Sequence, residues 1–440
     1  MNKRQFISIY TQQYTPRFHY AKYLVFELLL GLRVEEYNNL ESFEAINTPK
    51  INYSTLKIAN SFQIDPVQLL FDDTIKNFNL EIIAIKGQES QLFPTKGGDI
   101  NFDPLAAAFY VVSRYEEYLP NNRDEHDRYP AEQSILYKMD CLQIPIVQEW
   151  VNQLKEKLQV KFTTLSFSKP TFNYIPSFDI DMVWSYKGKG VYRTMGGYIK
   201  DFLSLDLESA KQRVKVNLSQ QEDPFDRFEY FGEQTTKNNL DPIFFFLMGK
   251  YSDYDKNISS DHPKFKQLIK SIADQYKTGI HPSYYYEKNV TKEINYLEMA
   301  SGKSIERSRQ HFIKLKFPDT YQLLIENKIK ADFSMGYPDK VGFRNGLAVP
   351  ALWYDLSKEE ISDFMVHPFQ IMDVTLKNYL KLEPEQAIET IKNLTDTIYQ
   401  YGGTMISIWH NSSFDKGWIG WQKVFEEMLS YAGKKTSNID

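Results

Sequence analysis

The chain has 440 residues, which is long enough for two or three domains. Hydrophobic residues make up 42% of it and charged residues 25%, as is typical of soluble globular proteins. The formal net charge of −5 argues against a nucleic-acid partner, because such a partner requires a clustered basic surface. A single cysteine, Cys141, excludes an internal disulfide and a cysteine-based zinc site.

Membrane insertion is not expected. No stretch approaches the ~18 apolar residues of a membrane span. The apolar segment 23–32 is interrupted by Glu27 and lacks the small-residue cleavage site of a signal peptide. We therefore expect a cytoplasmic protein with no membrane span.

Residues 1–168 are expected to form a smaller N-terminal domain of the α+β or α/β type. A strand is predicted over 80–85, and a helix is predicted from Asp103 to Tyr118, with an aspartate cap and a proline at its first position. A second helix is predicted over 145–158 from the spacing of its apolar residues. No residue spacing in this region is tied to a known chemistry, so its role stays open.

The charged segment 121–128 lies between these two helices and is expected to be a solvated loop. The segment 165–170 is a plausible domain boundary, because the sequence pattern changes after it.

Beyond this boundary, predicted strands alternate with predicted helices. The strands are expected at 242–248, 278–281 and 405–409, and the helices at 264–276, 305–315, 321–328 and 384–401. This alternation predicts that residues 169–440 form an α/β domain with a parallel sheet. Ligands of such sheets gather at the carboxyl ends of the strands.

Two aspartates, Asp179 and Asp181, end a strand-like segment that is rich in aromatic and β-branched residues. Side chains two residues apart on a strand lie on the same face. Two carboxylates on one face repel each other unless a metal or another cation lies between them. An aspartate pair that caps a turn at the strand end is the alternative interpretation.

Histidines follow two other predicted strands. His281 ends the strand at 278–281, and His410 follows the strand at 405–409. One histidine beside an apolar strand is usually structural. Two at strand ends, in a region that also has Asp-x-Asp, favour a metal-dependent hydrolase, since carboxylate oxygen and imidazole nitrogen are suitable ligands for Zn²⁺, Fe²⁺ or Co²⁺.

The order of these motifs resembles that of the polysaccharide deacetylase family, also called the NodB-homology domain or carbohydrate esterase family four. The resemblance covers roughly residues 172–420 and implies a distorted (β/α) barrel. It implies that Asp179 is the general base and Asp181 a metal ligand. The closing motif, Ile408-Trp409-His410, implies that His410 is the general acid.

The second motif of that family is His-x-x-x-His, and both of its imidazoles bind the metal. Here it starts at His281, but Tyr285 stands at the second position. A neutral phenol is a poorer ligand than imidazole. His311 is the nearest replacement in motif order, and the third ligand is left open between Tyr285, His311 and water.

Two further positions are implied by the resemblance. Arg309 corresponds to the arginine that holds the catalytic aspartate, with Arg344 as a rival in a glycine-flanked loop. Asp332 corresponds to the aspartate that orients the acid His410.

The expected function is a metal-dependent removal of an acetyl group from an N-acetylated sugar or polysaccharide precursor. The divalent metal is expected to be Zn, with Fe, Co or Ni as alternatives, and the expected partner is a carbohydrate substrate. Two other functions stay open: a carbohydrate-binding or scaffold protein that has the fold without the chemistry, and a C–N hydrolase that acts on a non-sugar amide.

Overall fold

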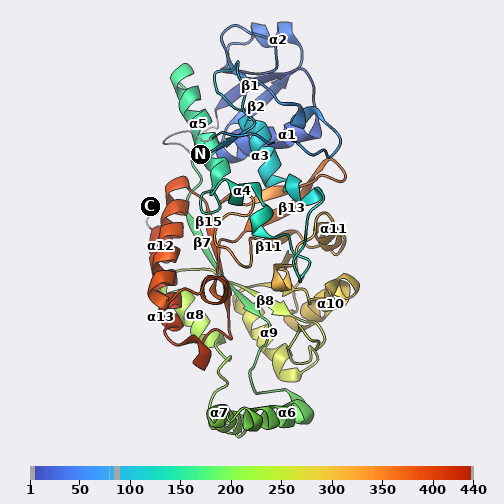
Figure 1. Cartoon of the computed structure of the whole chain (residues 1–440), viewed down its shortest axis with the longest axis vertical. Helices are drawn as coiled ribbons and strands as arrows, with labels where there is room; N and C mark the ends of the chain where they lie inside the picture. Colours follow the sequence, from blue (N-terminus) through green and yellow to red (C-terminus); the bar gives the residue numbers. More distant parts are fainter. Residues whose placement is uncertain (1–4, 79, 84–89, 438–440) are drawn as a thin grey trace.

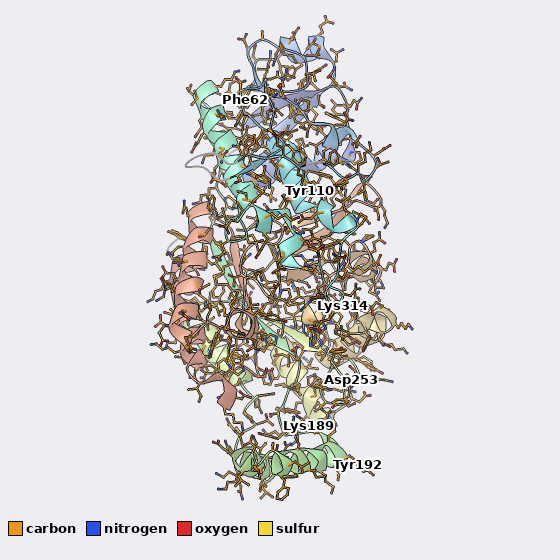
Figure 2. The ribbon with its side chains drawn as sticks, viewed as in Figure 1. Phe62, Tyr110, Lys189, Tyr192, Asp253 and Lys314 are labelled. Atoms are coloured by element: carbon orange, nitrogen blue, oxygen red, sulfur yellow. The ribbon has the colours of Figure 1, made fainter. Side chains whose placement is uncertain are left out.

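The protein is elongated, and a four-stranded and a nine-stranded sheet lie at different points along its length (Figure 1). The computed structural model describes residues 5–78, 80–83 and 90–437. In Figure 1 the N-terminal sheet lies near one end, a larger sheet with helices around it lies in the middle, and a pair of helices forms the other end. Phe62 and Tyr110 belong to the N-terminal end and Tyr192 to the opposite one (Figure 2).

The N-terminal sheet has four parallel strands in the order β2-β1-β3-β4. These are β1 (Phe6–Thr11), β2 (Arg33–Tyr37), β3 (Lys50–Tyr53) and β4 (Ser61–Ile64). The helices α1 (Pro16–Lys22), α3 (Pro104–Val112) and α5 (Ile146–Lys161) contribute buried apolar side chains to the same core. The strand expected at 80–85 is limited to β5 (Ile82–Ile83), and residues 84–89 lie outside the described part of the chain.

The helix expected from Asp103 to Tyr118 begins as predicted but is shorter. The Asp103 carboxylate accepts hydrogen bonds from the backbone N–H groups of Leu105 and Ala106, both at 3.0 Å. The α-helix ends at Val112, because Arg114 adopts a left-handed conformation (φ 56°), and a 3-10 turn then covers Tyr115–Tyr118. The helix expected at 145–158 is α5.

The larger sheet has nine strands, in the order β12-β13-β11-β10-β9-β8-β7-β15-β14. All its neighbouring strands are parallel except the pair β12 and β13. This confirms the predicted α/β architecture, and the antiparallel pair β12 and β13 makes the sheet mixed rather than wholly parallel. The strands are β7 (Asn173–Ile180), β8 (Ile243–Leu247), β9 (Lys277–His281), β10 (Arg307–Ser308), β11 (Ala331–Met335), β12 (Ala351–Asp355), β13 (Glu360–Pro368), β14 (Ile371–Met372) and β15 (Thr404–His410).

The sheet curls into an open half-barrel. β13 and β14 are seven places apart in the sheet, which on a flat sheet would separate them by about 34 Å. Only Phe369 and Gln370 join them in sequence, a link that spans at most about 11 Å. The Phe369 N–H donates to the Met335 carbonyl at 3.2 Å, and the Gln370 N–H donates to the Ile406 carbonyl at 3.1 Å. This two-residue link therefore bridges the gap between β11 and β15.

Helices around the sheet match three of the four predictions. They are α9 (Pro263–Gln275), α11 (Asp319–Glu326) and α12 (Pro384–Tyr401). The fourth prediction, a helix over 305–315, is wrong. That segment forms the short strand β10, which pairs with β9 and β11, and then a tight turn in which Phe312 and Ile313 have positive φ angles.

The N-terminal region and the half-barrel share a buried interface. Leu347, Val349 and Tyr354 from the second half pack into the N-terminal hydrophobic core. Arg344 donates three hydrogen bonds to the Glu117 carboxylate, at 3.1, 2.9 and 2.8 Å, and both side chains are buried. The domain boundary at 168/169 stays a prediction. No helix in the described part of the chain is both long and apolar enough to cross a bilayer.

Candidate active site

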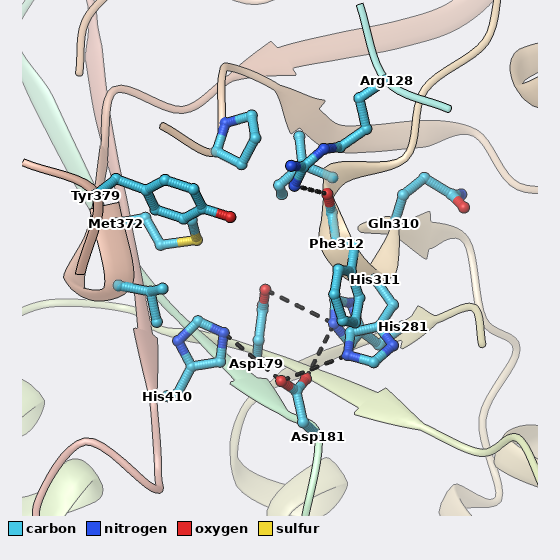
Figure 3. Close-up of a pocket in the computed structure, with 13 residues that line it drawn as sticks. Arg128, Asp179, Asp181, His281, Gln310, His311, Phe312, Met372, Tyr379 and His410 are labelled. Carbon is cyan, nitrogen blue, oxygen red and sulfur yellow. Dashed lines mark hydrogen bonds and ion pairs between the residues drawn. The ribbon is translucent and has the colours of Figure 1, made fainter. Parts of the chain in front are cut away.

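A pocket lies at the carboxyl ends of the strands of the half-barrel (Figure 3). Asp179 and Asp181 come from β7 and the residue after it, His281 ends β9, His311 follows β10, and His410 ends β15. The pocket is also lined by Arg128, Gln310, Phe312, Ile313, Pro338, Met372, Val374 and Tyr379. Asp179 and His410 are register partners on adjacent strands, although 231 positions separate them in the sequence.

Asp181 and His281 form the first contact of the site. The Nδ1 atom of His281 lies 2.6 Å from the Arg309 carbonyl oxygen, which can only accept, so this nitrogen carries a hydrogen. Nε2 of His281 lies 3.1 Å from Oδ1 of Asp181, and that oxygen is buried without a hydrogen-bond partner. In neutral His281, two lone pairs would face each other here, so a proton or a cation has to lie between them.

His311 approaches Asp181 from another direction. Its Nε2 atom lies 3.6 Å from Oδ2 of Asp181, and its Nδ1 atom lies 3.0 Å from Oδ1 of the buried Asp255. Burial lowers the pKa of His311, but the two carboxylates outweigh it and raise the pKa to about 9. For Asp181, burial opposes ionisation, yet His311, His281 and His410 hold the pKa of the carboxyl well below its usual range.

The three side chains together fit a divalent metal. Ligand atoms of Asp181, His281 and His311 all lie within 4.8 Å of one another. Each histidine turns Nε2 to the site and has Nδ1 bound to an oxygen behind it, which is the usual outer support of metal-binding histidines. The unpartnered Oδ1 of Asp181 is the atom that a cation would satisfy.

His410 lies on the other side of Asp181 and is held by Asp373. Its Nδ1 atom is 2.7 Å from Oδ1 of Asp373, and its backbone N–H donates to Oδ2 of the same residue at 2.8 Å. Burial lowers the pKa of His410, but Asp373, with Asp181 and Asp179, raises it to about 10. Imidazolium is therefore the stable form of His410 at neutral pH.

The expectation that Asp332 orients His410 is corrected by this geometry. Asp332 is buried on β11, where its carboxylate accepts from the hydroxyls of Ser308, Tyr321 and Ser334 at 2.7, 3.1 and 2.9 Å. Asp332 thus joins β10 to β11 beneath the site. The aspartate that supports His410 follows β14, the short strand beside β15.

Arg309 reaches Asp179, as the resemblance implied. Its guanidinium lies 3.1 Å from Oδ1 of Asp179, 2.7 Å from the hydroxyl of Ser177 and 3.0 Å from the Phe333 carbonyl, and it is fully buried. The rival, Arg344, binds Glu117 and the Gly336 carbonyl instead. Asp179 therefore lies between a buried cation and the cluster formed by Asp181, His281 and His311.

Tyr285 does not join this cluster. Its side chain is 54% exposed and its ring stacks edge-on with Tyr254 and Tyr284. His311 lies near His281 and Asp181 because it follows β10, which pairs with β9, the strand that ends at His281. Of the two side chains considered as the third ligand, Tyr285 and His311, only His311 lies close to Asp181 and His281.

Four residues of the site were not anticipated from the sequence. Asp255 supports His311 from a loop, and Asp373 supports His410 from the position directly after β14. The buried Gln310 lines the pocket with both side-chain polar atoms unpartnered. Arg128 comes from the segment expected to be a solvated loop. It is nearly buried, pairs with Asp124 at 2.7 Å and donates to the Phe312 carbonyl at 3.2 Å.

Comparisons with known proteins give limited matches. Residues 7–163 match a family model described as a family of unknown function (DUF7033). No curated protein matches the chain.

Several solved structures are similar over part of the chain. One is a putative polysaccharide deacetylase from Mycobacterium smegmatis (14% identity, TM-score 0.40, covering 61% of this chain and 86% of the other). Another is a mutant of a CE4 family pseudoenzyme with restored enzymatic activity (10% identity, TM-score 0.27, 60% and 69%). A third is a 7,8-dihydropteroate synthase from Vibrio fischeri (8% identity, TM-score 0.30, 63% and 96%). Scores of this size do not decide between functions.

Proposed function

We propose that this protein is a metal-dependent hydrolase that removes an acetyl group from an N-acetylated sugar or polysaccharide precursor. One observation carries the proposal: Asp181 lies between the metal-type histidines His281 and His311 on one side and the Asp373-supported His410 on the other. A base, an acid and a cation site thus converge in one pocket, as acyl transfer to water requires.

Asp181, His281 and His311 would hold the metal. When bound, Zn²⁺ or a similar ion would polarise an amide carbonyl and lower the pKa of water. Neutral imidazole and carboxylate suit Zn²⁺, with Fe²⁺, Co²⁺ and Ni²⁺ as alternatives.

Asp179 acts as the general base in this proposal. Its Oδ1 atom is held by Arg309 at 3.1 Å, and its Oδ2 atom lies 4.0 Å from Nε2 of His281. Arg309 fixes the orientation of the carboxylate, so that its second oxygen can take a proton from attacking water.

His410 acts as the general acid. An amine leaves an amide carbon readily only after protonation, and imidazolium next to Asp373 supplies the proton. Nε2 of His410 faces the cluster at 3.8 Å from Asp181, so its hydrogen points to the space where the leaving nitrogen would lie. The proton gained by Asp179 and the proton lost by His410 balance over the reaction.

The pocket wall supports a carbohydrate substrate. Tyr379 and Phe312 provide flat apolar surfaces, and the Tyr379 hydroxyl points into the pocket (Figure 3). Sugar rings present apolar faces that pack on such side chains. Gln310 and Arg128 add polar groups to the pocket lining on the side of Phe312, opposite Tyr379 (Figure 3).

The direct test is acetate release from N-acetylated oligosaccharides by protein loaded with Zn²⁺ or Co²⁺. Asp179→Asn should abolish turnover while metal content stays near one per chain. Release of ammonia instead of acetate from a panel of amides would assign the site to a different C–N hydrolase. Sugar binding without any turnover, unchanged by Asp179→Asn, would contradict the proposal.

A further inference from the structure

A helical hairpin projects from the half-barrel at the end of the molecule farthest from the N-terminal region (Figure 1). It consists of α6 (Gly190–Leu203) and α7 (Leu207–Asn217), and it is inserted between β7 and α8 (Phe228–Lys237). The chain enters it soon after the site residue Asp181.

The amphipathic pattern of α6 is reversed. The side of α6 that packs on α7 carries a buried ion pair, Asp201 to Arg213, with contacts of 2.8 and 3.2 Å, and Gly197 leaves room for that arginine. The outer side is apolar and exposed, whereas a helix of a globular protein normally buries its apolar side. The exposed side chains are Val191 (72%), Tyr192 (93%), Met195 (58%), Ile199 (58%), Phe202 (72%) and Leu203 (76%).

The apolar surface continues beyond α6. Leu205 in the turn is 80% exposed, and Leu207 and Leu218 at the ends of α7 are 65% and 62% exposed. Tyr192 lies at the outer edge of the hairpin, whereas Lys189 lies on the side that faces the body of the protein (Figure 2). A contiguous exposed apolar patch of this kind marks an interaction site.

Polar contacts, not the apolar side chains, attach the hairpin to the half-barrel. Asp223 accepts the backbone N–H groups of Ser185, Tyr186 and Lys187 at 2.7 to 3.0 Å. Arg193 donates to the carbonyls of Lys256 and Asn257 at 2.8 and 3.1 Å. The apolar patch is therefore available to a partner without any rearrangement of these attachments.

The hairpin is basic in an acidic protein. Residues 190–217, which span the two helices, contain five basic and three acidic side chains, a net charge of +2 in a chain of formal net charge −5. Two of the three acids are already paired, Asp201 with Arg213 and Asp206 with Lys416. Lys200, Lys211 and Lys215 are exposed, and among the described residues no ion pair joins them to a carboxylate.

We propose that the hairpin docks on the surface of an anionic lipid bilayer, with the apolar side of α6 in the boundary between head groups and acyl chains. Exposed aromatic and aliphatic side chains flanked by lysines are typical of helices that lie in a membrane interface. Lysines beside such a surface are attracted to anionic lipids. This inference goes beyond the proposed hydrolase function and does not depend on it.

A second copy of the chain fits the patch less well. A symmetric dimer through this surface would bring two hairpins of charge +2 together. Like charges facing each other oppose association, whereas an anionic bilayer complements them.

The experiment is sedimentation of the full chain with phosphatidylcholine vesicles that do or do not contain phosphatidylglycerol. We expect binding to the anionic vesicles, weaker binding at high salt, and an about tenfold or greater loss for Tyr192→Ser combined with Phe202→Ser. Lys211→Gln and Lys215→Gln should each reduce binding by about fivefold. Val160→Ser and Met299→Ser are matched controls, because these apolar side chains are equally exposed (83% and 76%) on other helices.

Two results would overturn the proposal. One is wild-type protein that stays in the supernatant with anionic vesicles. The other is a wild-type dimer in analytical ultracentrifugation that the Tyr192→Ser, Phe202→Ser protein does not form, because a second copy would then cover the patch. Circular dichroism of each variant confirms that the fold is kept. An inactive Asp179→Asn protein should bind vesicles as the wild type does, so failure of the hydrolase proposal would leave this result unchanged.

Discussion

Nε2 of His281 lies 3.1 Å from Oδ1 of Asp181, while Nδ1 of the same ring is committed to the Arg309 carbonyl. A proton or a cation between these two atoms would stabilise the pair, because Oδ1 of Asp181 is buried and has no other hydrogen-bond partner. The hydrogen bond from Nδ1 also ties Arg309, which holds Asp179, to His281, which faces Asp181, so Asp179 and the Asp181–His281 pair share one support.

The ligand role of His311 can be tested against Tyr285. We expect His311→Ala to lower Zn²⁺ or Co²⁺ affinity by at least about 100-fold, the upper end of what the loss of an outer hydrogen-bond partner costs. Tyr285→Phe should leave the affinity unchanged, because that side chain is exposed and away from the cluster. Competition titration with a chromophoric chelator measures both. Equal effects of the two substitutions on metal affinity would show that His311 is not a metal ligand.

Metal affinity should depend on pH. Because the pKa of His311 is raised to about 9, the metal-free site holds a proton there at neutral pH, and a metal must displace it. Affinity should thus rise by about tenfold per pH unit between about pH 6 and 8 and level off above about pH 9. Calorimetry in buffers of different ionisation enthalpy should show about one proton released per metal from this group. If His311→Ala abolishes this pH dependence of metal affinity, the displaced proton is the one on His311.

The support of His410 by Asp373 predicts a specific pKa change. Asp373→Asn removes the carboxylate that raises the pKa of His410 to about 10. The pKa of His410 should therefore fall, and its imidazolium should lose the proton at a lower pH than in the wild type. Turnover should drop by about 10²- to 10⁴-fold. NMR titration of the imidazole measures the pKa directly. Asp332→Asn is the matched control: it should leave the His410 titration in place, and a shift of equal size would restore Asp332 as the supporting group.

Arg128 should affect substrate binding more than catalysis. It lines the pocket and holds the Phe312 carbonyl, next to His311. Arg128→Ala should raise KM by about fivefold, the value of roughly one hydrogen bond, with kcat and metal content near those of the wild type. Arg123→Ala in the same loop is the control, because Arg123 donates to the Leu315 carbonyl without lining the pocket. A change in kcat alone would contradict this role.

Glu117 should be important for stability. It is buried between Arg114 and Arg344 and bonds both. Glu117→Ala would leave two buried guanidinium groups without their shared counter-charge, and we expect a loss of about 3–5 kcal/mol in the free energy of unfolding. Chemical denaturation measures this. Glu125→Ala, an exposed position on the loop that contains Arg128, should change stability by less than about 0.5 kcal/mol.

Local sequence patterns predicted the strands and helices where hydrophobic periodicity was strong. The buried strand β8 and the helix α12 lie where the pattern placed them. The segment 305–315 was misassigned, because a two-residue strand such as β10 leaves no periodic pattern, and its identity depends on pairing with β9 and β11. The turn at Phe312 that follows is also fixed by tertiary contacts.

The site was predicted where residues end well-defined strands and missed where they lie in loops or after a very short strand. Asp179, Asp181, His281 and His410 all follow or end buried strands. Asp373 was not found because it follows the two-residue strand β14, and its pairing with His410 exists only once β14 lies beside β15. Arg128 was not predicted because it lies in the charged segment 121–128, whose composition is typical of a solvated loop.

The pairing of His410 with Asp179 also determines when, during synthesis of the chain, the site can form. At a synthesis rate of about 5–20 residues per second, His410 leaves the ribosome roughly 10–50 s after Asp179, because 231 positions separate them. During that interval the growing chain carries the two aspartates and His281 without His410, and β7 lacks its neighbour on one edge. The order of the strands alone therefore keeps the site incomplete in unfinished chains.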